Sequence, residues 1–494
     1  MMKIVDFLVI GSGPAGRRAA IQAAKLGHNV LVVERGRKLG GVSVHTGTIP
    51  SKTLRETVLN LTGWRERGFY GRTYRVKQEI TAQDLHNRLR TTLNHEVEIL
   101  EHQFCRNRVE FRTGTARFTG PNEAEITHPD AHPIEVQFKK ALISVGTIPH
   151  RPDDIPFDGE KVLDSDDILE LQEIPRSLTV IGAGVIGVEY ASIFNALDVN
   201  VTLVEPRKTI LPFIDIDIVT ELVGELRDRG VDMRLGCKAA KITRLDNSVL
   251  TVLSDHRVIE SDMVLYAAGR TGAVGSLGLE NCGIETDCRG RIKVNADTMQ
   301  SSNDSIYAAG DIIGFPSLAS VSMEQGRIAA CHAFGAPLPE TRQAFPYGIY
   351  AVPEMSTIGA TEDELRQSGV CFECGIARFR ETSRGHIMGL DRGIMKMLFC
   401  LETKKLLGVH IVGEGATELI HIGQAVLNLG GTLNFFLENV FNYPTLAEAY
   451  KIAALDAWNK ISARRKITEI EEEMPAKQSE DQSTPLSDPV AKIA

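Results

Sequence analysis

The stretch Val5-Asp-Phe-Leu-Val-Ile-Gly-Ser-Gly-Pro-Ala-Gly16 decides the fold of this chain. Its apolar run predicts a buried strand, its glycine loop opens an apolar-periodic helix, and residues 29–33 predict a second strand. In this pattern Gly11 allows a tight turn, Gly13 lets the backbone approach a pyrophosphate, and Gly16 lets helix and strand pack closely. The pattern is typical of a dinucleotide-binding βαβ unit.

The same arrangement returns at residues 177–205. Its loop glycines are Gly182, Gly184 and Gly187. The second strand of each copy ends in an acidic residue, Glu34 in the first and Glu205 in the second, and such a carboxylate can accept hydrogen bonds from a ribose. Two copies predict an α/β protein with two Rossmann-like domains. They also suggest an oxidoreductase with one resident nucleotide and one that exchanges.

Three further apolar runs, at residues 141–145, 261–268 and 305–309, predict buried strands that stop at glycines. These turns contain Gly146, Gly269 and Gly310-Asp311. Turns of this kind at strand ends place backbone and side chains where a bound cofactor lies.

Residues 40–52 resemble the redox-disulfide segment of the pyridine nucleotide-disulfide oxidoreductases, with Ser43 and Thr48 in place of its two cysteines. That family also supplies a histidine base from a His-Pro-x-x-x-Glu segment, where this chain has Tyr443 and keeps Glu448. Hydroxyls cannot form a disulfide, and a phenol with a pKa near 10 is a poor base at neutral pH. Dihydrolipoamide dehydrogenase and glutathione reductase activities are therefore excluded.

Three segments resemble one branch of that family, the soluble, energy-independent pyridine nucleotide transhydrogenases. They are residues 47–52, 266–272 and 441–445. The resemblance covers roughly residues 4 to 460. It implies FAD as resident cofactor in the first copy, with Asp311 on its ribityl chain, and NAD(H) and NADP(H) as exchanging substrates in the second. Gly41, Gly146 and Gly269 are also expected among the cofactor-binding residues.

The resemblance also implies two catalytic residues, Lys52 and Glu189, as an ion pair beside the flavin N5. A cation there stabilises the anionic reduced flavin, and the carboxylate holds the ammonium in place. The expected reaction is a ping-pong hydride transfer between NADPH and NAD through FAD N5, of the Si-specific type. Alternatives are an NAD(P)H diaphorase or quinone reductase and, from another class, a non-catalytic FAD-holding scaffold or redox sensor.

One nucleotide pocket has to accept both a ribose 2′-hydroxyl and a 2′-phosphate. Glu205 suits the hydroxyl and would repel a phosphate, whereas Arg207 and Lys208 could pair with a phosphate. Arg207 and Lys208 could equally be solvated loop charges.

The chain order predicts an interrupted FAD-binding domain, residues 1–152 and 271–340, around an NAD(P)-binding domain at 153–270. A C-terminal α+β region, residues 341–466, corresponds in the family to the dimerisation domain. Residues 467–494 are rich in Glu, Ser, Asp, Pro and Gln, a composition that predicts a disordered tail.

Bulk composition excludes other classes. The chain has 55 Lys and Arg against 64 Asp and Glu, a net charge of -9 that argues against a nucleic-acid partner. No apolar run approaches a membrane span or a secretory signal, and the eight scattered cysteines fit a reduced, cytoplasmic chain without a metal site. Cys371 and Cys374 are expected to be bystander thiols. We also expect a homodimer or a larger assembly, and structural roles for His45 and His421.

Overall fold

The computed structural model describes residues 2–71, 73–338 and 344–473. Its first sheet has the strand order β3-β2-β1-β6-β5-β4, and β17 pairs with β6. The strands are β1 (Lys3–Ile10), β2 (Val30–Glu34), β3 (Glu110–Thr113), β4 (Thr115–Gly120), β5 (Glu123–His128), β6 (Ala131–Ile143) and β17 (Ile306–Ala308). β1, β2, β3, β6 and β17 are parallel, while β4 and β5 add an antiparallel edge. Because β17 comes from far along the chain, the second dinucleotide unit interrupts the first.

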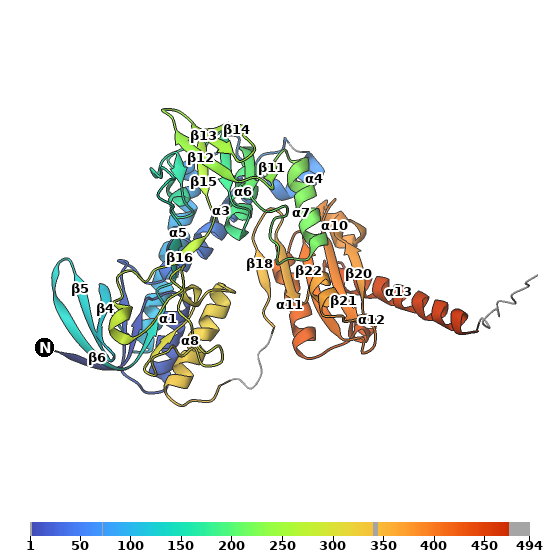
Figure 1. Cartoon of the computed structure of the whole chain (residues 1–494). Helices are drawn as coiled ribbons and strands as arrows, with labels where there is room; N and C mark the ends of the chain where they lie inside the picture. Colours follow the sequence, from blue (N-terminus) through green and yellow to red (C-terminus); the bar gives the residue numbers. More distant parts are fainter. Residues whose placement is uncertain (1, 72, 339–343, 474–494) are drawn as a thin grey trace, which may run out of the picture.

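Helices α1 (Pro14–Lys25) and α8 (Ala319–Ala333) pack against each other on the first sheet, with α5 (Ala82–Arg106) beside them (Figure 1). The α1–α8 contact is close because a Cβ on Gly326 would lie 2.1 Å from the carbonyl oxygen of Ala15. The buried side chains of Phe7 and Val9 on β1 form the core beneath these helices. This packing fixes the start of α1, where the first glycine loop ends.

The second sheet is parallel, with the order β11-β10-β9-β15-β8. Its strands are β8 (Val162–Leu163), β9 (Ser177–Ile181), β10 (Asn200–Glu205), β11 (Asp232–Leu235) and β15 (Met263–Tyr266). Helices α6 (Val185–Ala196) and α7 (Ile216–Asp228) belong to its core, and an antiparallel sheet is built from β12 (Ala239–Arg244), β13 (Val249–Leu253) and β14 (Val258–Ser261). Two short strands, β7 (Thr147–Pro149) and β16 (Arg270–Gly272), pair where the chain leaves and re-enters the first unit.

The C-terminal unit is an antiparallel sheet with the order β18-β19-β22-β21-β20. Its strands are β18 (Tyr347–Ile349), β19 (Met355–Gly359), β20 (Phe372–Arg378), β21 (Ile394–Cys400) and β22 (Leu406–Val412). Its helices are α9 (Glu362–Gln367), α10 (Ser383–Met388), α11 (Ala416–Asn428), α12 (Leu433–Glu438) and α13 (Glu448–Glu473). In Figure 1 this unit lies on the other side of the molecule from α1 and α8, and α13 extends away from it. The predicted α/β class with two Rossmann-like units and an α+β C-terminal region is confirmed.

The predicted start of the disordered tail is wrong. Residues 467–473 continue α13 instead of leaving it. Their sequence, Ile-Thr-Glu-Ile-Glu-Glu-Glu, is too polar to bury a core but contains four glutamates, and glutamate is a good helix former. A helix already held by its packed N-terminal half can therefore be extended by propensity alone. The rest of the predicted tail, 474–494, lies outside the described residues, as do 339–343.

A buried charge cluster joins the second unit to the C-terminal unit. Lys396 on β21 is fully buried, and its ammonium contacts Asp215, Asp217 and Glu362 at 2.9, 2.7 and 2.8 Å. Burial lowers the pKa of Lys396, but the three carboxylates raise it more, so the net shift is upward. Asp215 is also the N-cap of α7, so the cluster sets where that helix begins.

Candidate nucleotide and flavin site

The first glycine loop has the geometry that its residues predict. Gly11 has a φ of 99°, in the region that favours glycine. A Cβ on Gly16 would lie 1.9 Å from the carbonyl oxygen of Gly11, so the helix packs against the loop with no room for a side chain. At Gly13 a Cβ would meet nothing within 4 Å, which leaves the N-terminus of α1 open to a ligand. Its free N–H groups and positive dipole end suit a pyrophosphate.

Glu34, at the end of β2, is held by uncharged donors. Its Oε2 accepts hydrogen bonds from the backbone N–H and the hydroxyl of Ser12, at 2.8 and 2.7 Å. Its Oε1 accepts one from the N–H of Gly36 at 2.9 Å. These bonds orient the carboxylate and leave lone pairs that can accept from ribose hydroxyls.

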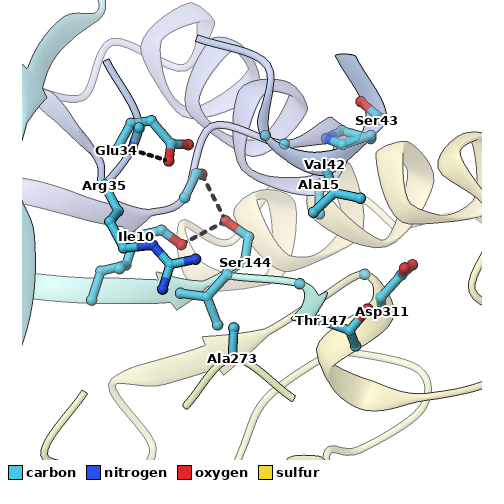
Figure 2. Close-up of a pocket in the computed structure, with 18 of the residues that line it drawn as sticks. Ile10, Ala15, Glu34, Arg35, Val42, Ser43, Ser144, Thr147, Ala273 and Asp311 are labelled. Atoms are coloured by element: carbon cyan, nitrogen blue, oxygen red, sulfur yellow. Dashed lines mark hydrogen bonds between the residues drawn. The ribbon is translucent and has the colours of Figure 1, made fainter. Parts of the chain in front are cut away.

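A pocket of about 580 Å³ runs along this loop. Figure 2 shows Glu34 on one side of the pocket, with Ser43 and Asp311 on the opposite side. Between them the Ser144 hydroxyl donates to the carbonyl oxygens of Ile10 and Gly11 (Figure 2). The predicted cofactor-binding residues brought together here are Gly11, Gly13, Glu34, Gly41, Gly146 and Asp311.

The residues of this pocket fit an elongated dinucleotide. One end offers a carboxylate for a ribose, the middle offers an open helix N-terminus, and Asp311 lies at the other end. Burial raises the pKa of Asp311, with the positive charge of Arg270 opposing the shift. A desolvated carboxylate of this kind is stabilised when hydroxyl groups of a ligand donate to it.

The second loop repeats the first loop's backbone. Gly182 also has a φ of 99°, and a Cβ on Gly187 would lie 1.8 Å from the carbonyl oxygen of Gly182. Gly184 is open, with nothing within 4 Å of its Cβ position. Gly269, at the end of the neighbouring strand β15, has a φ of 122° and is equally open. The second unit can therefore receive a pyrophosphate in the same way.

The hydrogen-bond partners of Glu205 differ from those of Glu34. It accepts from the N–H of Ala183 at 2.7 Å and from the N–H of Arg207 at 3.0 Å. The Arg207 guanidinium adds a two-pronged contact, Nε to Oε1 at 2.7 Å and Nη2 to Oε2 at 2.9 Å. Burial would raise the pKa of Glu205, but Arg207 and the two backbone donors lower it further than burial raises it. From the sequence, Arg207 was expected to contact either a phosphate or solvent, and this ion pair with Glu205 was not predicted. Lys208 is exposed.

Lys52 and Glu189 form an ion pair between the two units. The Lys52 ammonium lies 2.8 and 2.7 Å from the two carboxylate oxygens, and Glu189 is almost fully buried. Lys52 lies on α3 (Thr48–Leu61), and Glu189 lies on α6 of the second unit. The ammonium itself stays partly accessible, with its side chain 25 % exposed. A cation held in this way can stabilise negative charge that develops nearby.

Tyr350 completes this ion pair, and sequence reasoning missed it. Its backbone N–H donates to Glu189 Oε1 at 2.8 Å, and its ring centre lies 4.9 Å from the Lys52 ammonium. Tyr350 follows β18 of the C-terminal unit, 161 residues from Glu189. No local motif marks it, because the contact exists only once all three units have packed.

Ser43 and Thr48 both line the pocket. They are close in sequence but belong to different helices. Ser43 lies in α2 (Gly41–His45) and donates to the carbonyl oxygen of Gly40 at 3.1 Å. Thr48 is the first residue of α3. These positions beside the cofactor pocket carry hydroxyls only.

The remaining predicted positions have ordinary partners. His45 bonds to the carbonyl oxygen of Leu39 at 2.9 Å, and His421 bonds to Gln424 at 2.8 Å. Tyr443 is exposed, and its hydroxyl lies 2.6 Å from that of Ser383. All eight cysteines, including Cys371 and Cys374, are free thiols.

Glu448, by contrast, has a buried Oε2 with no hydrogen-bond partner among the described residues. In the described part of the chain, no three His, Cys, Asp or Glu side chains lie so as to hold a metal ion. Every helix described there is too short or too polar to cross a membrane.

Two dinucleotide loops that follow parallel strands, an elongated pocket at the first loop and a Lys–Glu pair between the two units define the class of two-nucleotide flavoproteins. The chain belongs to the pyridine nucleotide-disulphide oxidoreductase family. The family's model matches residues 5–326, and the model of its dimerisation domain matches residues 345–454.

Two relatives from different organisms share a name. The soluble pyridine nucleotide transhydrogenase of Mycobacterium tuberculosis is 49% identical over 463 residues, covering 94% of this chain and 99% of the relative. The protein of the same name from Escherichia coli is 39% identical and covers 92% of this chain and 98% of the relative.

Solved structures agree on the fold. LpdA of Mycobacterium tuberculosis superimposes with a TM-score of 0.84 at 27% identity, covering 91% of this chain and 99% of that one. The flavoprotein disulfide reductase RclA of Escherichia coli superimposes with a TM-score of 0.81 at 27% identity, covering 91% of this chain and 99% of that one.

Proposed function

We propose that the protein transfers hydride between NADPH and NAD through a bound FAD, without a redox disulfide. The observation that carries this proposal is the Lys52–Glu189 pair, whose lysine lies one turn after Thr48 on α3, together with the hydroxyls of Ser43 and Thr48 that line the pocket. The relatives named soluble pyridine nucleotide transhydrogenase support it, at 39% to 49% identity over nearly the whole chain.

We assign FAD to the first unit and the exchanging nucleotides to the second. The residues that would hold FAD are Gly11, Gly13, Gly16, Glu34, Gly41, Gly146 and Asp311. The residues that would hold a nicotinamide nucleotide are Gly182, Gly184, Gly187, Glu205, Arg207, Lys208 and Gly269. In domain terms the FAD unit is residues 1–152 with 271–340, and the NAD(P) unit is 153–270.

FAD, when bound, supplies a ring that accepts a hydride from one nicotinamide nucleotide and returns it to another. Lys52 provides a fixed positive charge, which favours the negative charge that hydride transfer brings to the site. Glu189 holds the ammonium with two oxygens, and the Tyr350 N–H holds Glu189. These contacts fix the position of the ammonium.

The hydroxyl side chains of Ser43 and Thr48 limit which electron acceptors the protein can use. Ser43 and Thr48 have no thiolate and cannot form a disulfide, so they cannot pass electrons to a thiol substrate. The second unit instead offers a loop that can bind either nucleotide in turn. Glu205 would accept from a ribose 2′-hydroxyl, and Arg207 with Lys208 would pair with a 2′-phosphate.

An assay with NADPH and the thio-analogue of NAD tests this proposal. Reduction of the analogue, unchanged after iodoacetamide has alkylated the accessible thiols, is the expected result. Reduction of a quinone or dye but not of the analogue would instead assign a diaphorase. A bound flavin that neither NADPH nor NADH bleaches would assign a scaffold. NADPH deuterated on one face of C4 tests the proposed Si-specific transfer.

We further propose a homodimer formed through the C-terminal unit. That unit exposes large apolar side chains at Leu429, Val440 and Trp458, with Leu429 86% and Val440 88% exposed. Exposed apolar groups of this size on a domain matched by a dimerisation model favour a subunit contact. Light scattering should give a dimer, and Val440→Asp should weaken it. The free thiols favour a cytoplasmic location.

A further inference from the structure

A second cavity, of about 780 Å³, lies where the three units meet. It shares no lining residue with the pocket along the first glycine loop. One wall is formed by the end of α3, η1 (Trp64–Glu66) and α4 (Arg67–Tyr70), and a second wall by α6 and α7. The third wall is the segment from η5 (Phe379–Glu381) to β21. α4 approaches this segment closely, since a Cβ on Gly68 would lie 2.3 Å from the carbonyl oxygen of Gly389.

The charged residues of this cavity are unusual in type. Its positive residues are all arginines, seven of them against six carboxylates among the described lining residues. Four arginines already have carboxylate partners. These pairs are Arg55 with Glu56, Arg65 with Glu414, Arg229 with Glu225, and Arg392 with Asp228. Burial raises the pKa of Glu225, and the charges of Arg229 and Arg392 oppose that shift.

Arg67 is an arginine of this cavity whose guanidinium is buried and only partly hydrogen-bonded. Its side chain is 12% exposed, and its Nε and Nη2 are buried without a hydrogen-bond partner among the described residues. Its closest carboxylate, Asp198, lies 3.9 Å from Nη1 and also pairs with Arg75. Burial and the charge of Arg75 both lower the pKa of Arg67. Each unpaired N–H of a buried guanidinium would gain from an added acceptor.

The surroundings of Arg67 hold its fork in place. The guanidinium carbon of Arg67 lies 4.8 Å from the Trp64 ring centre, and that of Arg229 lies 4.0 Å from it. Arg378 and Arg380 on the facing wall are exposed, and their side chains have no ion-pair partner in the described part of the chain. The cavity is therefore lined by Arg67, which shares its one carboxylate with Arg75, and by two arginines that have no ion-pair partner among the described residues.

We propose that this cavity binds a phosphate-class oxyanion, with Arg67 as its principal ligand and Arg378 and Arg380 as further cationic contacts. A guanidinium fork matches two oxygens of a phosphate or carboxylate. A phosphate carries more than one negative charge per group, so it compensates several arginines where a single carboxylate cannot. The cavity has room for more than one linked phosphate, which makes inorganic pyrophosphate a suitable probe.

Calorimetric titration of the FAD-loaded protein with pyrophosphate, without any nicotinamide nucleotide, tests the proposal. We expect saturable binding of one pyrophosphate per chain, with inorganic phosphate weaker and citrate distinguishing a carboxylate site from a phosphate site. Arg67→Met keeps an unbranched apolar side chain but removes the fork, and should weaken binding at least about tenfold. Arg176→Met is the control, because that side chain is 93% exposed and lies outside the cavity. It should change binding less than about twofold.

Four results would overturn the proposal. Absence of saturable binding is the first, and citrate binding more tightly than pyrophosphate is the second. The third is binding that Arg67→Met leaves intact while pyrophosphate competes with NADPH, since that places the anion at the second glycine loop. If Arg67→Met does not fold with FAD, Arg380→Met gives the same test from an exposed position. Loss of the dimer in either variant without pyrophosphate binding would assign these arginines to a subunit contact.

Discussion

The two glycine loops have the same backbone but hold their carboxylates differently. In each copy, the glutamate that ends the second strand accepts two backbone hydrogen bonds. One comes from the residue that follows the first loop glycine, and the other comes from the residue two positions after the glutamate. In the first copy that later residue is Gly36, and in the second it is Arg207, whose guanidinium also binds Glu205. The two loops thus share one backbone arrangement, and only the second has a positive charge beside its carboxylate.

Under the proposed function, this difference would let one pocket serve two nucleotides. Glu34 has only neutral donors, so it stays available to a ribose at all times. Glu205 is paired with Arg207, whose side chain is 48% exposed. We expect a 2′-phosphate to take Arg207 away from Glu205, and a 2′-hydroxyl to bind Glu205 beside it.

Blocking each loop in turn should give the largest effects. Gly16→Ala and Gly187→Ala each push a Cβ to within 2 Å of a loop carbonyl oxygen, so the helix must move away from its strand. We expect Gly16→Ala to lose most of its FAD, and Gly187→Ala to stay yellow but to be bleached at least about 100-fold more slowly by NADPH and NADH. Flavin content and bleaching rate are the measurements. A yellow Gly16→Ala protein, or a colourless Gly187→Ala protein, would contradict the assignment of the two loops.

The ion pair that joins the two copies comes next. Lys52→Met removes the cation and leaves Glu189 buried without a charged partner. Flavin reduction should slow by about 100-fold, because the loss of one preorganised electrostatic contact typically costs that much. Lys77→Met, which removes an exposed lysine paired with Asp84, is the control and should change the rate less than about twofold. Equal rates in Lys52→Met and wild type would mean that the pair only supports packing.

Exchanging the residues beside the carboxylates should alter nucleotide preference. Arg207→Ala with Lys208→Ala should lower kcat/KM for NADPH by roughly ten- to a hundredfold, about 1.5 to 3 kcal/mol for each lost charge-assisted hydrogen bond. The same double variant should spare or improve NADH use, since Glu205 is released. Glu205→Ala should do the reverse. Stopped-flow flavin reduction by each nucleotide gives these constants, and equal losses for both nucleotides would place discrimination elsewhere.

The first copy offers the mirror of that experiment. Gly36→Arg brings the second copy's arginine beside Glu34, where a new ion pair would compete with the ribose. FAD affinity should fall by about tenfold, with the flavin still reducible once bound. Fluorescence titration of the flavin-free protein measures it, and Lys38→Arg in the same loop is a control that adds no charge. Unchanged FAD affinity in Gly36→Arg would show that a positive charge beside Glu34 does not affect cofactor binding.

The smallest effect concerns pH. The pKa of Glu205 is lowered in the folded protein, so its pairing stabilises the fold above the ordinary glutamate pKa and is lost as the pH falls through the lowered value. Because Arg207 is half exposed, the contribution should be below about 1 kcal/mol. Wild type should therefore lose slightly more thermal stability than Arg207→Ala between pH 6 and pH 3. A larger loss in Arg207→Ala would reverse the sign that we expect.

Local patterns predicted the parts of this molecule that local physics determines. Both glycine loops follow from residue spacing, since only glycine fits where a Cβ would meet a carbonyl oxygen. The pairing of Lys52 with Glu189 came from the family resemblance, because spacing alone does not bring residues 137 apart together. Tyr350 and the arginines around Trp64 gave no signal, as their contacts depend on how three units pack. The extra helix at 467–473 was missed because composition reports the lack of a core and not the helix propensity of glutamate.

One anaerobic single-turnover experiment tests the central claim most directly. Protein whose thiols are alkylated is mixed with one equivalent of NADPH, and an excess of NAD is added after the flavin has been bleached. Our account predicts full bleaching, then full recovery of the flavin colour with one NADH formed per FAD. Bleaching without recovery by NAD, or recovery only when the thiols are left free, would contradict hydride transfer between nucleotides without a disulfide.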